Sequence, residues 1–174
     1  MKLYNKVSKR FQKELLCGDG IYKKSGRQVT GIGTIGFFAR DGNNSEIIYV
    51  VTTGHSYNDS GSNTFYFFPW GDRPDNCVIG YMEKHSIENY DYGLINYRAI
   101  DGIYINSVSF ATELIITDME AGVGDSGGPA YFYYENLYSV SLSGILTGGN
   151  KGITTILPLQ IILDETGIVP ILVN

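Results

Sequence analysis

The stretch Gly124-Asp125-Ser126-Gly127-Gly128-Pro129 is the most informative part of this 174-residue chain. It places one serine among glycines, which have no side chain to shield the hydroxyl and which let the backbone turn tightly. A serine nucleophile in acyl transfer needs such a setting, because its hydroxyl must be reachable and backbone N–H groups must converge on the developing oxyanion. The stretch therefore predicts a turn that presents Ser126 as a nucleophile.

Two residues upstream complete a pattern. His55 follows the stretch Thr52-Thr53-Gly54, and Asp91 opens the stretch Asp91-Tyr92-Gly93-Leu94-Ile95. The order His, Asp, Ser is one of the known arrangements of a catalytic triad. Neither residue is diagnostic alone, since single histidines are usually packed or exposed without a function, and aspartates are frequent in turns. The interpretation rests on both residues together with the serine stretch. The other histidine, His85, matches no motif and is predicted to lie at the surface.

The composition is that of a turn-rich β protein. Hydrophobic residues make up 43% and charged residues 18% of the chain, which allows a sizeable core. The 22 glycines and 14 tyrosines favour strands and turns over helices. A net charge of −5 argues against nucleic acid as a partner. No apolar run reaches the length of about 18–20 residues that spans a membrane, and the N-terminus lacks the apolar stretch of a signal peptide.

The N-terminal part has a different charge from the rest. Eight of the residues 1–27 are lysine or arginine and two are acidic. Apolar residues at i, i+4 spacing indicate a short amphipathic helix there, formed by Leu3, Val7, Phe11 and Leu15. A solvated arm or the remnant of a pro-segment is favoured over a membrane-surface helix. We therefore expect a basic arm over residues 1–17 and a folded domain over residues 18–174. Cys17 and Cys77 fit one disulfide or two thiols equally well.

Short apolar runs between turn residues predict strands through most of the chain. The predicted strands cover residues 34–40, 46–53, 63–68, 78–82, 92–97, 104–110, 113–119, 130–134, 140–147 and 153–157. The aromatic run at 65–68 is expected to be paired or covered, because an open aromatic edge invites association. Pro158 and Gly167 bracket a predicted helix over residues 159–166. This helix is too short to be stable alone and is therefore expected to dock on the β body.

With these residues in place, the chain resembles the chymotrypsin-like serine endopeptidases, and among them the streptogrisin and α-lytic branch. The resemblance spans residues 18–173 and is strongest at the serine stretch. Residues 143–150 are similar to the substrate-binding strand of bacterial members, and the C-terminal helix is also similar. The resemblance implies an all-β fold of two packed antiparallel β-barrels with a short C-terminal helix. The first barrel would span about residues 18–98 and the second about residues 99–174.

The resemblance implies a role for each triad residue. Ser126 would be the nucleophile, and His55 would take its proton and later give it to the leaving amine. Asp91 would hold the imidazole in the useful tautomer and stabilise its charged form. The backbone N–H groups of Gly124 and Ser126 would bind the oxyanion. The implied activity is hydrolysis of peptide bonds through an acyl-enzyme, without a metal or an organic cofactor.

The resemblance also implies substrate-binding residues. Thr147, Gly148 and Gly149 would form the strand that pairs with the substrate backbone. Thr147 stands where the family usually has a serine whose hydroxyl supports the triad aspartate. Glu120 occupies the position that forms the pocket floor in trypsin-like members, where a carboxylate would favour lysine or arginine in the substrate. The alternative is that Glu120 is simply solvated.

Several features depart from the family pattern. Only 35 residues separate Asp91 from Ser126, so the second barrel is expected to lack strands. Asp125 is expected to have a positively charged partner, as its family counterparts do. The missing strands favour one alternative function, a catalytically inactive protease-like binding or regulatory protein. The expected partners are proteins or peptides, not nucleic acid, and the chain is expected to be a monomer without stable membrane insertion. The resemblance implies an extracellular location, although no signal peptide is recognised in the chain.

Overall fold

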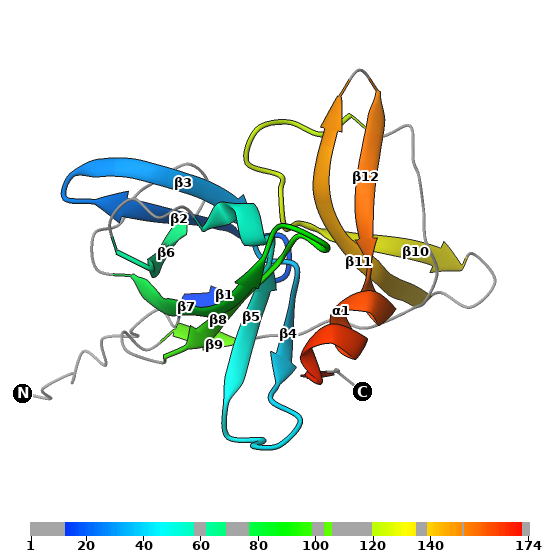
Figure 1. Cartoon of the computed structure of the whole chain (residues 1–174), viewed down its shortest axis with the longest axis horizontal. Helices are drawn as coiled ribbons and strands as arrows, with labels where there is room; N and C mark the ends of the chain where they lie inside the picture. Colours follow the sequence, from blue (N-terminus) through cyan, green and yellow to red (C-terminus); the bar gives the residue numbers. More distant parts are fainter. Residues whose placement is uncertain are drawn as a thin grey trace, which may run out of the picture.

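The structure, a computed structural model, describes residues 13–57, 62–68, 77–98, 103–105, 120–134, 139–150 and 152–171. Most of these residues lie in strands (Figure 1). The strands are β1 (Lys13–Leu15), β2 (Gly20–Ser25), β3 (Gln28–Thr34), β4 (Phe37–Arg40), β5 (Ile48–Thr52), β6 (Thr64–Phe68), β7 (Val78–Ser86), β8 (Tyr92–Tyr97), β9 (Ile103–Ile105), β10 (Pro129–Tyr134), β11 (Ser139–Asn150), β12 (Ile153–Pro158) and β13 (Val169–Pro170). The helical elements of these described segments are the 3₁₀ turn η1 (Gly54–Ser56) and the helix α1 (Leu159–Thr166).

The described strands form two main sheets. The first has eight antiparallel strands in the order β13-β4-β5-β8-β7-β6-β2-β3, and the second has three in the order β10-β11-β12. β1 pairs in parallel with β9. Figure 1 shows the two sheets side by side, with α1 next to the second. The prediction of an all-β fold with one short C-terminal helix is confirmed. The aromatic strand β6 lies between β2 and β7, so the predicted pairing of this strand is also confirmed.

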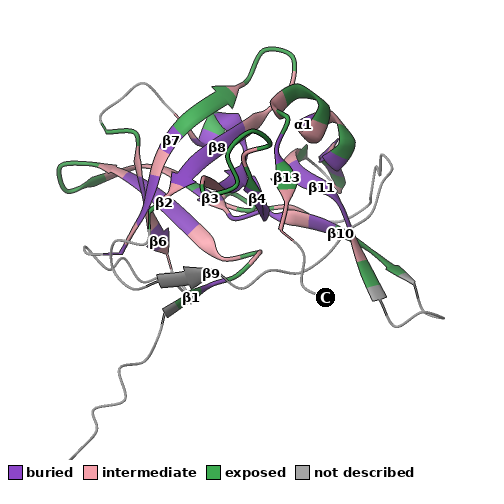
Figure 2. Ribbon diagram, turned by 90° about the horizontal axis from the view of Figure 1, so that it is seen from below, coloured by how far each residue is buried: buried purple, intermediate pink, exposed green. Residues whose placement is uncertain are grey.

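The strands nearest the second sheet are buried on both faces. Successive side chains of a strand point to opposite faces, and in β4, β5 and β8 the two sets join different cores. One set, Phe38, Val50 and Ile95, packs inside the first sheet with residues such as Ile21 and Phe65. The other set packs against the second sheet and α1 and consists of Phe37, Ala39, Tyr49, Val51 and Leu94. Because both faces of these strands are buried (Figure 2), their sequences are mostly runs of apolar residues rather than alternating apolar and polar residues.

The C-terminal helix confirms the bounds predicted for it. Leu159 and Ile162 are buried in the core between the sheets, so α1 docks on the β body as expected. Gly167 ends the helix in the left-handed region, with φ of 67°, and its N–H donates to the Leu163 carbonyl at 2.8 Å. β13 then pairs with β4, which returns the end of the chain to the first sheet.

The prediction of one strand over residues 34–40 is wrong, because the chain bends between β3 and β4. At the bend, the N–H of Ile35 donates to the Asp19 carbonyl and the N–H of Gly36 donates to the Val51 carbonyl. A side chain at Gly36 would lie 2.5 Å from Ile145 Cγ2, so the bend packs directly against the second sheet. The β2–β3 hairpin before this bend was not predicted.

The folded body begins before residue 18. Lys13–Leu15 is the strand β1, and Leu15 is fully buried in the first core, so the predicted arm is too long and the predicted helix does not reach Leu15. The rest of the arm, residues 1–12, lies outside the described residues. So do residues 106–119, which contain most of two predicted strands. Cys17 and Cys77 are thiols without a disulfide between them.

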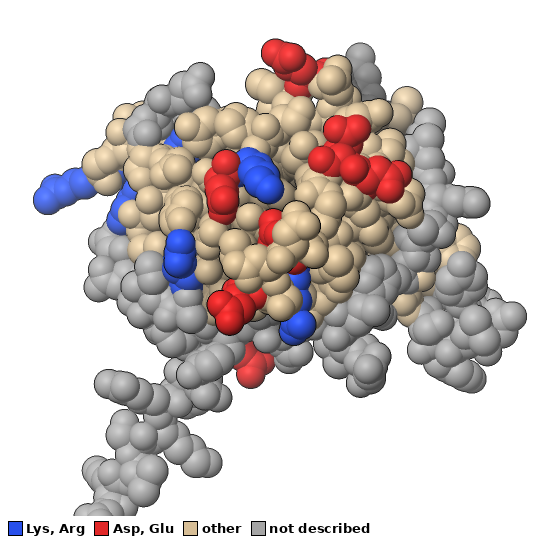
Figure 3. Space-filling model, turned by 60° about the horizontal axis from the view of Figure 1, so that its bottom comes forward, with Lys and Arg blue, Asp and Glu red and all other residues tan. Residues whose placement is uncertain are grey.

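Two observations concern partners. Figure 3 shows acidic and basic side chains interspersed over one face of the described residues, with no concentrated basic area on that face. Within the described residues, no helix has the length and apolar character needed to span a bilayer.

Candidate active site

The pairing of β5 with β8 brings His55 to Asp91. Thr52, the last residue of β5, lies opposite Gly93 near the start of β8. The residues just beyond these two strand ends therefore meet. They are Asp91 and the turn η1, which carries His55. Gly54 is required in this turn, because a Cβ there would overlap the carbonyl oxygen of Ser86. The missing side chain lets η1 rest on the backbone of β7 and β8.

Two hydrogen bonds fix His55 against Asp91. Asp91 Oδ2 lies 2.6 Å from the ring nitrogen Nδ1, and Asp91 Oδ1 accepts the backbone N–H of His55 at 2.9 Å. The hydrogen bond to Asp91 raises the pKa of His55, partial burial opposes this, and the negative charge of Asp91 adds to the rise. A proton on Nδ1 leaves the lone pair on Nε2, which is the tautomer that a general base needs.

Two successive tight turns present Ser126. The N–H of Asp125 donates to the Gly122 carbonyl, and the N–H of Gly128 donates to the Asp125 carbonyl. The third residue of each turn is a glycine with positive φ, 107° at Gly124 and 91° at Gly127, as type II turns require. Gly124 and Gly127 of the sequence stretch therefore have a direct structural cause, and Ser126 is the second residue of the second turn, where it is partly exposed.

The serine loop is attached to the first sheet through a threonine at the end of β3. The N–H of Thr34 donates to the Ser126 carbonyl at 2.8 Å, and its hydroxyl donates to the Gly124 carbonyl at 2.7 Å. The hydroxyl of Thr52, three residues before His55, donates to the Thr34 carbonyl at 2.8 Å. These bonds join the loop to the strand that leads to the histidine. The sequence contains no local signal for Thr34 or Thr52.

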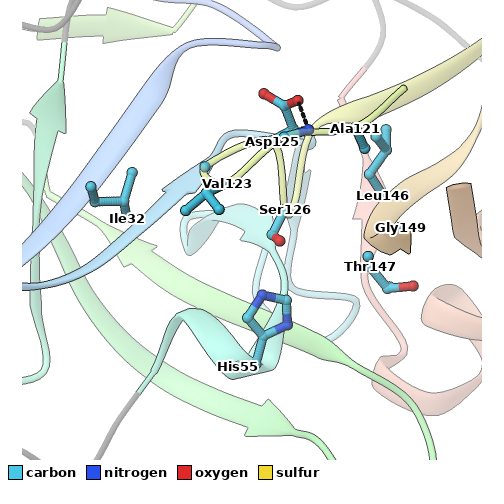
Figure 4. Close-up of a pocket in the computed structure, with 12 residues that line it drawn as sticks. Ile32, His55, Ala121, Val123, Asp125, Ser126, Leu146, Thr147 and Gly149 are labelled. Atoms are coloured by element: carbon cyan, nitrogen blue, oxygen red, sulfur yellow. Dashed lines mark hydrogen bonds between the residues drawn. The ribbon is translucent and has the colours of Figure 1, made fainter. Parts of the chain in front are cut away.

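His55 and Ser126 line the same pocket, which has a volume of about 450 Å³. The Ser126 side chain points toward the His55 ring (Figure 4). Among the described residues no hydrogen bond joins the two side chains, and catalytic hydrogen bonds are often long before substrate binds. Within the same part of the chain, the backbone N–H groups of Gly124 and Ser126 have no acceptor. Both donors are therefore available to an anion beside the serine hydroxyl.

The predicted substrate strand also lines the pocket. Thr147, Gly148 and Gly149 belong to β11, and their pairing with β12 uses one edge of that strand. β10 pairs with the other edge only up to Ile145. The next residue, Leu146, accepts a hydrogen bond from the N–H of Gly127 and donates one to the carbonyl of Gly128. Beyond Leu146 this edge has no partner among the described strands, so it is open to an extended peptide.

Three expectations from the resemblance are not met. Glu120 is exposed and does not line the pocket, because the wall is formed by the next residues, beginning with Ala121. The Thr147 hydroxyl lies near the hydroxyl and carbonyl of Thr155 rather than supporting the aspartate. Asp125 accepts the N–H of Gly122 at 2.8 Å and forms no ion pair with any described lysine or arginine.

The described residues offer no obvious metal site, since nowhere among them do three His, Cys, Asp or Glu side chains converge. No family sequence model and no curated protein sequence matches the chain.

Solved structures do match. The chain is similar to a protease of Nocardiopsis, with 13% identity, a TM-score of 0.61, and coverage of 90% of this chain and 98% of that one. A homologue of alpha-lytic protease matches with 14% identity, a TM-score of 0.60, and coverage of 90% and 99%. A Cellulomonas bogoriensis chymotrypsin matches with 17% identity, a TM-score of 0.58, and coverage of 92% and 100%. The chain therefore has the fold of the chymotrypsin-like serine proteases.

Proposed function

We propose that the chain is a serine endopeptidase that hydrolyses peptide bonds through an acyl-enzyme. The single observation that carries this proposal is the convergence of the Asp91-bonded His55 and the partly buried Ser126 on one pocket. The pocket offers a base, a nucleophile and two amide donors within one short loop and one turn. Neither the fold nor the sequence stretch alone would require this combination, which makes a catalytic role the best explanation.

In the proposed reaction, Ser126 Oγ attacks the carbonyl carbon of the scissile bond while His55 Nε2 accepts the hydroxyl proton. Asp91 stabilises the resulting imidazolium through the Nδ1 hydrogen bond. The negative oxygen of the tetrahedral intermediate accepts the N–H groups of Gly124 and Ser126, and one such donor is typically worth about 10²–10³ in rate. His55 then protonates the leaving amine. Water, activated by the same histidine, releases the acyl group from Ser126.

The substrate is expected to bind as an extended strand along the open edge of Thr147–Gly149. This mode uses backbone hydrogen bonds for affinity and leaves a side-chain pocket for selectivity. The described pocket lining contains one acidic side chain, Asp125, and its carboxylate is bonded to Gly122 and directed away from Ser126 (Figure 4). With Glu120 outside the lining, we expect an uncharged residue before the cleaved bond rather than lysine or arginine.

Labelling with a fluorophosphonate tests the proposal directly. The probe forms a covalent bond only with an activated serine, so we expect one adduct, located at Ser126 by peptide mass mapping. Labelling should be much slower in the variant His55→Ala and unchanged in His85→Gln, because His85 lies outside the pocket. A chain that melts cooperatively but takes up no label would contradict the proposal and favour the alternative of an inactive binding protein.

The pH profile tests the pairing of His55 with Asp91. His55 must be neutral to act as a base, and Asp91 raises the pKa of this histidine. The acidic limb of kcat/KM is therefore expected to have its midpoint above about 6.5, the ordinary value for histidine. Asp91→Asn should move the midpoint to lower pH and reduce kcat by about 10⁴-fold. His85→Gln should leave the profile unchanged. A midpoint that stays in place in Asp91→Asn would contradict the assignment.

A further inference from the structure

Two apolar side chains lie on the side of Ser126 that is opposite Thr147 and Gly149 (Figure 4). Ile32 comes from β3 and is 38% exposed, and Val123 comes from the turn before the serine and is fully exposed. Both line the same pocket as His55. The Cβ position of Gly124 lies 3.5 Å from Ile32 Cγ2, so the loop backbone rests against the isoleucine. We call these two side chains the Ile32–Val123 shoulder.

The two sides of Ser126 differ in what they can bind. The open edge of Thr147–Gly149 offers backbone donors and acceptors, which suit the part of an extended substrate that becomes the acyl group. If this part lies along β11 and its carbonyl carbon is at Ser126 Oγ, the chain after the scissile bond must leave on the opposite side. That side is formed by the shoulder, which presents two apolar side chains, one of them on β3, the outermost strand of the first sheet.

We propose that the Ile32–Val123 shoulder binds the side chain of the residue that follows the cleaved bond and selects for an apolar one. This inference rests on the proposed function. Contact with the shoulder removes apolar surface from water on both partners, which favours apolar side chains over polar ones of the same shape. A partly exposed apolar surface discriminates modestly, and we expect a preference of roughly tenfold.

Capture of the acyl-enzyme by amines measures this preference separately from the binding of the acyl part. The acyl-enzyme is formed from the p-nitrophenyl ester of N-acetylalanine. An added amine attacks the ester carbonyl carbon, a C–N bond forms, and the bond from that carbon to Ser126 Oγ breaks. The amine loses a proton to His55, which passes it to Ser126 Oγ. This step is the reverse of amine departure, so the amine occupies the position of the leaving residue.

Leucinamide and asparaginamide are a suitable pair of amines, because their side chains have similar shapes and opposite polarity. We expect leucinamide to compete with water roughly tenfold better than asparaginamide, measured as the ratio of amide to free acid by chromatography. Val123→Thr keeps the side-chain shape and replaces a methyl group by a hydroxyl, Ile32→Thr replaces an ethyl group by a hydroxyl, and each should reduce this ratio at least threefold. Val169→Thr is the matched control, because Val169 is 56% exposed on β13 and does not line the pocket.

The outcomes separate the two proposals. Equal capture of both amines, or an unchanged ratio in both shoulder variants, would overturn the inference while ester turnover still supported the proposed function. A loss of preference in Val169→Thr as large as in the shoulder variants would also overturn it. If the folded chain neither turns over the ester nor takes up a fluorophosphonate, the proposed function fails, and the inference fails with it.

Discussion

Ser126→Ala is expected to lower kcat/KM for peptide hydrolysis by about 10⁵–10⁶-fold, because loss of the nucleophile removes the acyl-enzyme route entirely. A small residual rate should remain, since the oxyanion donors and the substrate strand would still bind the transition state. The fold should be unaffected. Within the described residues the serine hydroxyl makes no hydrogen bond, and the Thr34 N–H bonds to the backbone carbonyl of residue 126, which alanine retains.

Both parts of this expectation can be measured. The melting temperature should stay within about 2 °C of the wild-type value, as is usual for surface substitutions. Ser25→Ala is the matched control, since Ser25 is exposed in the hairpin between β2 and β3 and should keep full activity. Peptidase activity close to wild type in Ser126→Ala would mean that another residue is the nucleophile, and the proposed mechanism would be wrong.

The elements that were predicted well are those with local signals. Helix α1 has a proline before its first residue and a glycine after its last, and both mark the ends through backbone geometry alone. β8 is a short apolar run between turn residues. The β2–β3 hairpin lacks such a signal, since it contains charged residues and glycines. Lys23 in this hairpin is completely buried, with its amine 4.4 Å from the centre of the Tyr57 ring, a contact that only the tertiary structure creates.

The same distinction applies to the site. The serine stretch predicted its own turns, because glycine at positive φ is a local requirement. The contact of His55 with Asp91 is expected from the order of the triad residues and from the resemblance, not from a local signal, since strand pairing across 36 residues produces it. Thr34 was missed because its three bonds join it to residues 18, 90 and 92 positions away, at Thr52, Gly124 and Ser126. For Glu120 the resemblance implies the pocket floor, with a solvated side chain as the alternative, and Glu120 is exposed outside the pocket lining.

Gly127→Ala is expected to be strongly destabilising for the addition of a single methyl group. The residue has φ of 91°, which costs an L-residue about 1–2 kcal/mol. A Cβ there would also overlap Thr52 Oγ1 and the Thr34 carbonyl oxygen. These two atoms are the partners of the hydrogen bond between Thr52 and Thr34, and Thr34 in turn holds the serine loop, so neither atom can move without breaking a hydrogen bond. We expect a loss of roughly 4 kcal/mol in the free energy of unfolding, which is large for a point substitution.

Gly152→Ala separates the two causes of this loss. Gly152 has a similar φ of 81°, and a Cβ there would meet no atom within 4 Å. It should therefore cost only the backbone term of about 1–2 kcal/mol. Urea unfolding of both variants measures the difference, and failure of Gly127→Ala to fold would count as the larger loss. Equal losses would show that the contacts with Thr34 and Thr52 carry no energy. Because those contacts fix the position of Ser126, Gly127→Ala should also abolish fluorophosphonate labelling in any folded fraction, whereas Gly152→Ala should label normally.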